Sequence, residues 1–336
     1  MTLNITTAAR WLMAQSSDFR LTFTDADGKR DVDSDTAQKQ FVLTYPKWSG
    51  LLCYTGIARH YEHDTATWLE NLLVHSPDER RNPEDIVRLL KREGNWLRAI
   101  APEDRRTTFT MIAYDKNSIP RIWVISNFER PDQPQKEKGE DNLFCTRIRA
   151  GHPRNVITGW PKAVLPEQRQ ALLDLISRNP DRDDLSDAVA ITNRDAAPRA
   201  KRSANDAEEV SKECVVATLS PDGSGQIVVY GDLPKEFLPC IIQCGKNVPA
   251  LGQMKENAKG KMLDSVSWPA KKYLSIGVMG AVCMRVRYPV GFKWPDDPNA
   301  PPRFQAPVEF TMEPNDQAPP GSKPTKVEWF HREGLP

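Results

Sequence analysis

The residue with the clearest chemical potential is Thr2, which follows the initiator methionine in MTLNITTAARWLMAQSSDFRLT. If Met1 is removed, Thr2 carries both a hydroxyl group and a free α-amine. An α-amine has a reference pKa of about 7.7–8.0, so an appreciable fraction is neutral at pH 7. A neutral amine can accept the proton of the neighbouring hydroxyl and make its oxygen a nucleophile. The sequence therefore predicts N-terminal threonine catalysis once the bond between Met1 and Thr2 is cut.

Three charged residues and one glycine are candidates to complete such a site. A nucleophile of this kind needs a nearby cation, a carboxylate that holds the cation, and backbone N–H groups that stabilise an oxyanion. Asp18 and Arg20 stand two residues apart on an expected strand and so share a face, while Lys39 offers a second cation. Gly56 in YTGIA can bring its N–H close to a reacting carbonyl, because glycine allows close backbone approach.

A second kind of site is conceivable in the segment RHYEHD, where His60, His63 and Asp64 have a spacing that could bind a metal. The simpler interpretation is a polar helix start with Asp64 as N-cap. We therefore expect no bound metal and no cofactor.

The cysteines show no metal-binding or disulfide pattern. Cys240 and Cys244 are four residues apart and no second pair stands at zinc-finger spacing. We expect reduced, mostly buried thiols. The six cysteines are Cys53, Cys145, Cys214, Cys240, Cys244 and Cys283.

Composition and charge exclude several classes of partner. The 336 residues carry a formal net charge of +1, so we expect no nucleic acid and no anionic membrane as partner. The longest apolar run, residues 276–284, is too short to span a bilayer. Arg10, Asp18 and Arg20 interrupt any apolar leader in the first 25 residues. A cytoplasmic protein is expected.

Residues 1–231 alternate strand and helix patterns in a regular order. Residues 3–13 and 17–24 are strand-like, 25–35 form a polar insert, and 38–46 and 49–58 are apolar strand runs. Later segments include one helix that starts at Asn82–Pro83, an N-cap followed by proline at N1. The remaining expected elements are a helix from 64 or 65, a hairpin over 107–128, a strand near 143–153, helices 166–177 and 183–194, and a hairpin of strands 214–220 and 226–231.

This order predicts stacked antiparallel sheets with helices outside. Residues 232–336 differ because they are rich in proline and tryptophan and contain long irregular stretches. We therefore expect two parts, a domain at 1–231 and an extension or small subdomain at 232–336.

Four motifs resemble the proteasome β-type subunits of the N-terminal nucleophile (Ntn) hydrolase family: Thr2 itself, SSDFRLT, QKQFVL and LLCYTGIA. In that family an aspartate in a DSRAT-like motif follows the terminal threonine by sixteen residues, and Asp18 has this spacing from Thr2. The family lysine before the next apolar strand matches Lys39, and the glycine after the following strand matches Gly56. The resemblance covers residues 2–231.

The resemblance implies an α+β fold, a four-layer αββα sandwich, and an active site that hydrolyses peptide or other amide bonds. It also implies assembly into a homo-oligomer, often ring-like. In the implied site Thr2 is nucleophile and base, Lys39 activates it, Asp18 holds Lys39, and Gly56 donates to the oxyanion.

Two further positions follow from the resemblance, and one departs from it. Thr158 in VITGWP and Asp195 in TNRDAA match residues that support the terminal amine. Pro198 stands where the family has a serine after the RDA step, so one hydroxyl is lost. The insert at 25–35 and the C-terminal extension are also foreign to a standard subunit.

Three functions therefore stay open. The first is a threonine-type hydrolase of peptide or other amide bonds. The second is a catalytically inactive scaffold or binding subunit, favoured by Pro198 and by the large extension. The third and weakest is a metal-dependent hydrolase that uses His60, His63 and Asp64.

Overall fold

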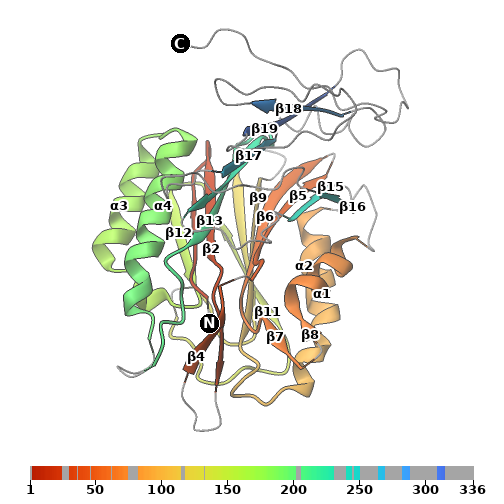
Figure 1. Cartoon of the computed structure of the whole chain (residues 1–336), viewed down its shortest axis with the longest axis vertical. Helices are drawn as coiled ribbons and strands as arrows, with labels where there is room; N and C mark the ends of the chain where they lie inside the picture. The colour runs from red at the N-terminus through yellow and green to blue at the C-terminus, as the bar shows by residue number, and fades with distance from the viewer. Residues whose placement is uncertain are drawn as a thin grey trace, which may run out of the picture.

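The chain forms a mixed α/β structure with two large sheets and helices on opposite flanks (Figure 1). No helix in the described part is both long and apolar enough to cross a membrane. Met1 and most of residues 232–336 lie outside the described part. The computed structural model describes residues 2–24, 30–35, 37–45, 47–61, 63–74, 82–114, 118–131, 133–201, 206–230, 240–243, 246–249, 264–268, 282–287 and 309–314.

The described strands of the first sheet, eight in number, begin at the edge strand β12 and include the first two strands of the chain. Neighbours pair antiparallel except for β17 and β19, which are parallel. The strand order is β12 (Arg154–Thr158), β1 (Asn4–Ala8), β2 (Met13–Asp18), β13 (Cys214–Leu219), β14 (Gly225–Tyr230), β17 (Asp264–Trp268), β19 (Glu309–Pro314) and β18 (Val282–Arg287).

The second sheet contains seven described strands and begins at the edge strand β11. Its pairs are antiparallel except for β15 with β5. The order is β11 (Phe144–Arg149), β10 (Pro120–Ser126), β9 (Thr107–Tyr114), β6 (Trp48–Gly56), β5 (Gln40–Tyr45), β15 (Cys240–Gln243) and β16 (Lys246–Pro249). Two small ribbons accompany the sheets, β3 (Leu21–Thr24) with β4 (Arg30–Ser34) and β7 (Arg59–His60) with β8 (His63–Asp64).

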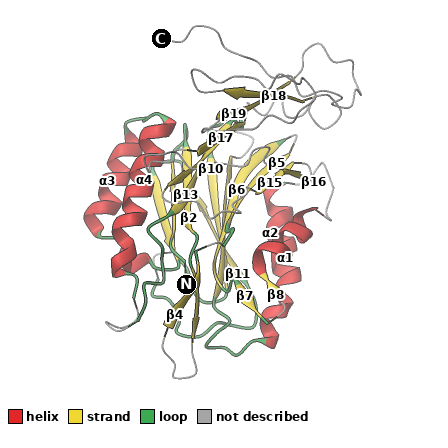
Figure 2. Cartoon of the chain, viewed as in Figure 1, coloured by secondary structure: helices red, strands yellow, loops and turns green. Residues whose placement is uncertain are grey.

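The helices fall into two pairs, which Figure 2 shows in red on either side of the strands. One pair belongs to the seven-stranded sheet and the other to the eight-stranded sheet. The helical segments are α1 (Thr65–Val74), α2 (Pro83–Glu93), η1 (Gly94–Ala99), η2 (Pro161–Ala163), α3 (Pro166–Ser177), α4 (Arg182–Ala196) and η3 (Ala197–Arg199).

Three buried clusters hold these elements together, since burial of apolar surface is the main stabilising term in folding. The first joins α1 and α2 to the seven-stranded sheet, through side chains such as Leu69 and Leu90. The second contains residues of both sheets, among them Leu51 and Val215. The third joins α3 and α4 to the eight-stranded sheet, with Ile5 among its members.

Polar side chains also connect the two sheets, close to the first strand. The Gln15 side-chain amide of β2 donates to the hydroxyl of Thr6 and to the carbonyl of Thr110 in β9, each at 3.1 Å. It accepts a hydrogen bond from Gln40 of β5 at 2.9 Å. A buried polar group needs such partners to avoid the cost of desolvation, so this contact fixes the two sheets relative to each other.

Several element boundaries match the sequence pattern and others do not. The prediction of a capped helix at Asn82 is confirmed: the Asn82 side chain accepts from the Asp85 N–H at 3.0 Å, and Asp85 accepts from the Asn82 N–H at 2.9 Å. The prediction of one strand over 3–13 is wrong, because the chain turns where the Ala9 N–H donates to the Leu12 carbonyl and two paired strands result. Part of the polar insert at 25–35 is strand β4.

Candidate active site

Thr2 lies at the start of β1 and is 2 % exposed. Gly159, just after β12, lies against the Thr2 backbone and has a φ of +80°. A Cβ at position 159 would overlap the carbonyl oxygen of Thr2 and would also approach the Thr55 side chain to 3.3 Å. Only glycine combines this backbone angle with so close an approach, so Gly159 fixes the carbonyl side of Thr2.

Asp18, at the end of β2, is fully buried next to the start of β1. Its carboxylate accepts three backbone N–H groups, from Leu3 at 3.3 Å, Arg20 at 3.1 Å and Ser211 at 3.3 Å. Hydrogen bonds to a charged acceptor are stronger than neutral ones. Because Leu3 directly follows Thr2, this carboxylate also fixes the position of the first strand.

Lys39 precedes β5 and is the cation that reaches Asp18. Its ammonium nitrogen lies 3.5 Å from both carboxylate oxygens and donates to the Arg20 carbonyl at 2.6 Å. The lysine side chain is 1 % exposed and the aspartate 0 %. Burial lowers the pKa of Lys39, and the attraction of Asp18 opposes that shift only in part. The structure thus brings Asp18 and Lys39 together as a buried ion pair beside Thr2.

Arg20 does not send its side chain into this site. Its guanidinium binds Asp35 at 2.8 and 2.9 Å and donates to the Glu208 carbonyl at 3.1 Å. The hydrogen bond to Asp35 raises the pKa of Arg20. Arg20 serves the site through its backbone, because its N–H binds Asp18 and its carbonyl binds Lys39.

Gly56 ends β6 and has a φ of +101°. Gly56 is the register partner of Thr107 in β9, and a Cβ at position 56 would overlap the carbonyl oxygen of the preceding residue, Arg106. This contact explains why position 56 is glycine.

Among the described residues, no hydrogen bond joins the Lys39 ammonium to the Thr2 hydroxyl.

The two positions that rest on the family resemblance alone lie in different surroundings. Thr158 is buried in β12 opposite Asn4, and its hydroxyl lies 3.1 Å from the hydroxyl of Thr110. Asp195 is exposed on α4, where it accepts from the Gln168 side chain at 3.5 Å. Thr158 is therefore adjacent to the first strand, whereas the structure does not bring Asp195 to Thr2.

Two residues near Thr2 have no clear signal in the sequence. Ser211 supplies an N–H to Asp18, and its hydroxyl accepts from the Phe19 N–H at 3.3 Å. Glu129 is 3 % exposed and accepts from the Gly159 N–H at 3.2 Å and from Gln135 at 2.6 Å. Burial raises the pKa of Glu129. Ser211 stands in a segment that reads as a charged linker, and Glu129 at the end of a hairpin strand.

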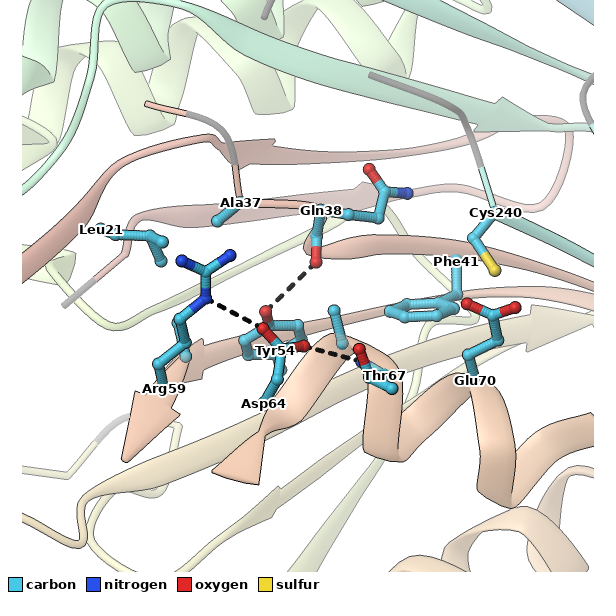
Figure 3. A pocket seen from close by; sticks show the side chains of 12 residues that line it. Leu21, Ala37, Gln38, Phe41, Tyr54, Arg59, Asp64, Thr67, Glu70 and Cys240 are labelled. Carbon is cyan, nitrogen blue, oxygen red and sulfur yellow. Dashed lines mark hydrogen bonds and ion pairs between the residues drawn. The ribbon is translucent and has the colours of Figure 1, made fainter. Parts of the chain in front are cut away.

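A pocket of about 240 Å³, shown in Figure 3, is lined by Gln38, the residue before Lys39. Tyr54 connects the pocket to Lys39, since its N–H donates to the Lys39 carbonyl at 3.3 Å and its hydroxyl to the Gln38 carbonyl at 3.1 Å. Leu21 and Phe41 give the pocket apolar walls. Its other lining residues are Ala37, Ala58, Arg59, Asp64, Ala66, Thr67, Glu70 and Cys240.

The alternative metal site does not assemble. His63 stacks on Trp96 with ring centroids 3.7 Å apart, and burial lowers its pKa. Asp64 accepts from the Thr67 N–H at 2.8 Å, as an N-cap does, and from Arg59 at 3.0 Å. Within the described residues no three His, Cys, Asp or Glu side chains are grouped to hold a metal.

Cys53, Cys145, Cys214 and Cys240 are free thiols, and all but the half-buried Cys145 are buried.

Comparison with known proteins gives only weak relationships. No protein-family model matches the chain, and no curated protein matches it. Solved structures that match include the Anbu Gly-1 mutant from Hyphomicrobium sp. strain MC1, with 15 % identity over 66 % of this chain and 82 % of that chain and a TM-score of 0.42. Anbu from Yersinia bercovieri, described as an ancestral beta-subunit, has 13 % identity over 65 % and 81 % and a TM-score of 0.43. The helical assembly of the Anbu complex from Pseudomonas aeruginosa has 14 % identity over 65 % and 81 % and a TM-score of 0.39.

These findings correct the family assignment made from the sequence. The prediction that the chain is a proteasome β-type subunit of the Ntn hydrolase family is wrong: no family model supports it, and the matching structures named above are Anbu proteins. The motifs behind the resemblance are short. Two of their residues have local structural reasons in this fold, because Asp18 binds backbone N–H groups and Gly56 meets a neighbouring carbonyl. Similarity this low transfers no activity to this chain.

Proposed function

We propose that this protein is an N-terminal threonine hydrolase that cleaves peptide or other amide bonds after removal of Met1. The observation that supports this most is the buried pair of Lys39 and Asp18, which lies against the N–H of the residue after Thr2. A buried cation with a lowered pKa is typical of catalytic sites. Its position beside a threonine that becomes the amino terminus favours catalysis over a purely structural ion pair.

The proposed reaction uses groups that belong to this chain. The Thr2 oxygen attacks the substrate carbonyl while its proton passes to the α-amine of the same residue. Lys39 stabilises the negative charge that develops at the threonine oxygen, and the Gly56 N–H donates to the oxyanion. The carbon–nitrogen bond then breaks and the leaving amine takes the proton from the α-amine. Water hydrolyses the resulting ester and restores the hydroxyl.

The pocket next to Gln38 is the proposed site for a substrate side chain. At about 240 Å³ it is smaller than the range of roughly 300–1,000 Å³ that holds whole small-molecule ligands. Leu21, Phe41 and Tyr54 offer apolar and aromatic surface, and Glu70 adds a carboxylate. These residues favour a side chain with an apolar stem.

The proposal extends to the architecture. A four-layer αββα sandwich within residues 1–231 is supported by the three apolar clusters, which join helices to sheet, sheet to sheet, and sheet to helices. Residues 232–336 are proposed as an extension, and their described strands β15 to β19 continue the two sheets. We also propose a homo-oligomer in the cytoplasm. Thr158, buried opposite Asn4, is proposed as a further member of the site, and Asp195 is not included.

A catalytically inactive scaffold or binding protein is the second candidate. The observation that favours it is the engagement of the Lys39 ammonium by Asp18 and the Arg20 carbonyl, with no hydrogen bond to the Thr2 hydroxyl among the described residues. The exposed position of Asp195 favours it as well.

Two measurements separate these functions. Intact mass of the purified protein shows whether Met1 is removed, and a β-lactone probe acylates an activated Thr2 hydroxyl. The hydrolase predicts loss of Met1 and labelling of the wild type but not of Thr2→Ala. Retention of Met1 on protein that is active would overturn the mechanism. Processed protein that the probe leaves unlabelled would favour the scaffold.

A further inference from the structure

A second pocket, of about 420 Å³, lies between the edge strands of the two sheets. Strand β11 contributes Arg149, strand β12 contributes Arg154, and helix α3 contributes Arg169. Both strands are the terminal strands of their sheets. The loop that starts at Glu129 and includes Arg130 completes the wall. Residues far apart in the sequence therefore bring four arginines to the wall of one cavity.

Arg149, Arg154 and Arg169 form no ion pair with any carboxylate that the structure describes. By contrast, Arg121 on β10 and Arg147 on β11 both lie near the Glu84 carboxylate of α2, at 3.8 and 3.2 Å. Like charges around one cavity repel each other, and an anion inside it would relieve that repulsion.

The walls are partly pre-formed for such a ligand. The Arg169 guanidinium is oriented by the carbonyls of Val164, at 3.2 Å, and Pro161. The Asn155 side chain donates to the Arg169 carbonyl at 2.7 Å and so ties α3 to β12. Glu129, an acidic residue of the described wall, already accepts hydrogen bonds from the Gly159 N–H and the Gln135 side chain. Because burial raises its pKa, it opposes an anion less than an ordinary carboxylate does.

We propose that this pocket binds a small anion with at least two negative charges, carried by phosphate or carboxylate groups. The planar fork of arginine matches both groups through paired hydrogen bonds. The volume lies within the roughly 300–1,000 Å³ of small-molecule sites. The competing explanation is that arginines on edge strands only prevent pairing with another chain. This proposal does not depend on the chemistry of Thr2.

The test is thermal unfolding of the full-length protein titrated with pyrophosphate or with citrate, at an ionic strength held constant with sodium chloride. A ligand that binds only the native state raises the melting temperature in a saturable way. We expect saturation with at least one probe, and the tighter probe identifies the anion as a phosphate or a carboxylate. No saturable rise with either probe, beyond that of sodium chloride, would overturn the proposal.

Variants locate the binding. Arg154→Ala and Arg149→Ala should each weaken binding by about 10-fold, since a charge-assisted hydrogen bond is lost. Arg154→Lys keeps the charge but not the planar guanidinium, so it should lose less affinity for the anion than Arg154→Ala. If an alanine variant does not fold, Arg154→Lys is used in its place. Arg88→Ala is the matched control, because Arg88 is exposed on α2 and pairs with Asp85. Equal affinities in the wild type and both pocket variants would show that the arginines serve only the sheet edges.

Discussion

Two buried carboxylates bind backbone next to Thr2, Asp18 at Leu3 and Glu129 at Gly159, and they are stabilised in different ways. Asp18 has a lysine ammonium 3.5 Å away and accepts three backbone N–H groups. Glu129 receives its hydrogen bonds from neutral donors, the Gly159 N–H and the Gln135 amide, and burial raises its pKa. A buried charge needs a partner or it tends to become neutral. Asp18 therefore holds a buried cation, whereas Glu129 holds the backbone at Gly159.

The largest expected effect tests whether the site at Asp18 is catalytic. Replacing Thr2 by alanine removes the nucleophile, so amide hydrolysis should fall by about 10⁴-fold or more, as it does when a catalytic nucleophile is removed. Turnover of a fluorogenic peptide measures this loss, and the melting temperature should change little. Thr22→Ala on β3 is the control, and it should keep activity. An unchanged rate in Thr2→Ala would contradict catalysis at this residue.

The next effect concerns the ion pair itself. Lys39→Met leaves Asp18 buried without its cation, which should destabilise the protein by about 3–5 kcal/mol. Urea unfolding measures the change in the free energy of unfolding. Lys47→Met is the matched control, because Lys47 is exposed at the other end of the β5–β6 hairpin and should have an effect near zero. Equal stabilities of the two variants would show that the buried pair contributes nothing.

A smaller effect is expected on the backbone that Glu129 supports. Gly159→Ala must place a Cβ against the Thr2 carbonyl at a positive φ, so it should cost about 1–3 kcal/mol of stability. Gly151→Ala is the control, since a Cβ there meets nothing within 4 Å. If Thr2 is catalytic, Gly159→Ala should also reduce turnover. A variant as stable and active as Gly151→Ala would refute the role of this contact.

The smallest effect is a pH dependence. Because the pKa of Glu129 is higher in the folded protein than its ordinary value of 4.5, the folded state binds the proton more tightly. This group therefore stabilises the fold most at low pH, and that contribution is lost as the pH rises from 4.5 through the raised pKa. Glu129→Gln cannot ionise and should lose less stability than the wild type between pH 4.5 and pH 8.

Urea unfolding at both pH values measures this difference. Gln135→Ala, which removes a donor but keeps the carboxyl, should not flatten the pH dependence. Identical pH profiles for Glu129→Gln and the wild type would show that Glu129 has the same pKa in both states.

The sequence alone predicted most of the local structure. Strands β5 and β6, expected at 38–46 and 49–58, follow from side-chain periodicity, as does the hairpin of β9 and β10. The capped helix α2 follows from the residues at its start. These signals are local, because alternation and capping depend on neighbours a few residues away. The sequence gives no signal for the break of the first strand at Ala9, because the turn at residues 9–12 has no glycine or proline.

The site was predicted only in part, because sequence signals are local and the contacts between distant segments are not. The residue types offered both Arg20 and Lys39 as the cation beside Thr2, the family resemblance pointed to Lys39, and the structure places Lys39 there. The Arg20 side chain meets Asp35, so the buried position next to Asp18 belongs to Lys39. Asp195 fits a motif, yet the turn of α4 on which it stands faces solvent.

What the sequence determined by itself is the set of chemical groups: a threonine next to the first residue, a set of charges, and the elements that carry them. Only the tertiary structure decided which groups meet. Glu129 reaches Gly159, and Arg149 and Arg169 share a cavity, because strand pairing and helix packing join segments that are distant along the chain. The physical reason is that local periodicity fixes the face on which a side chain lies, whereas its neighbours depend on the order of strands in two sheets.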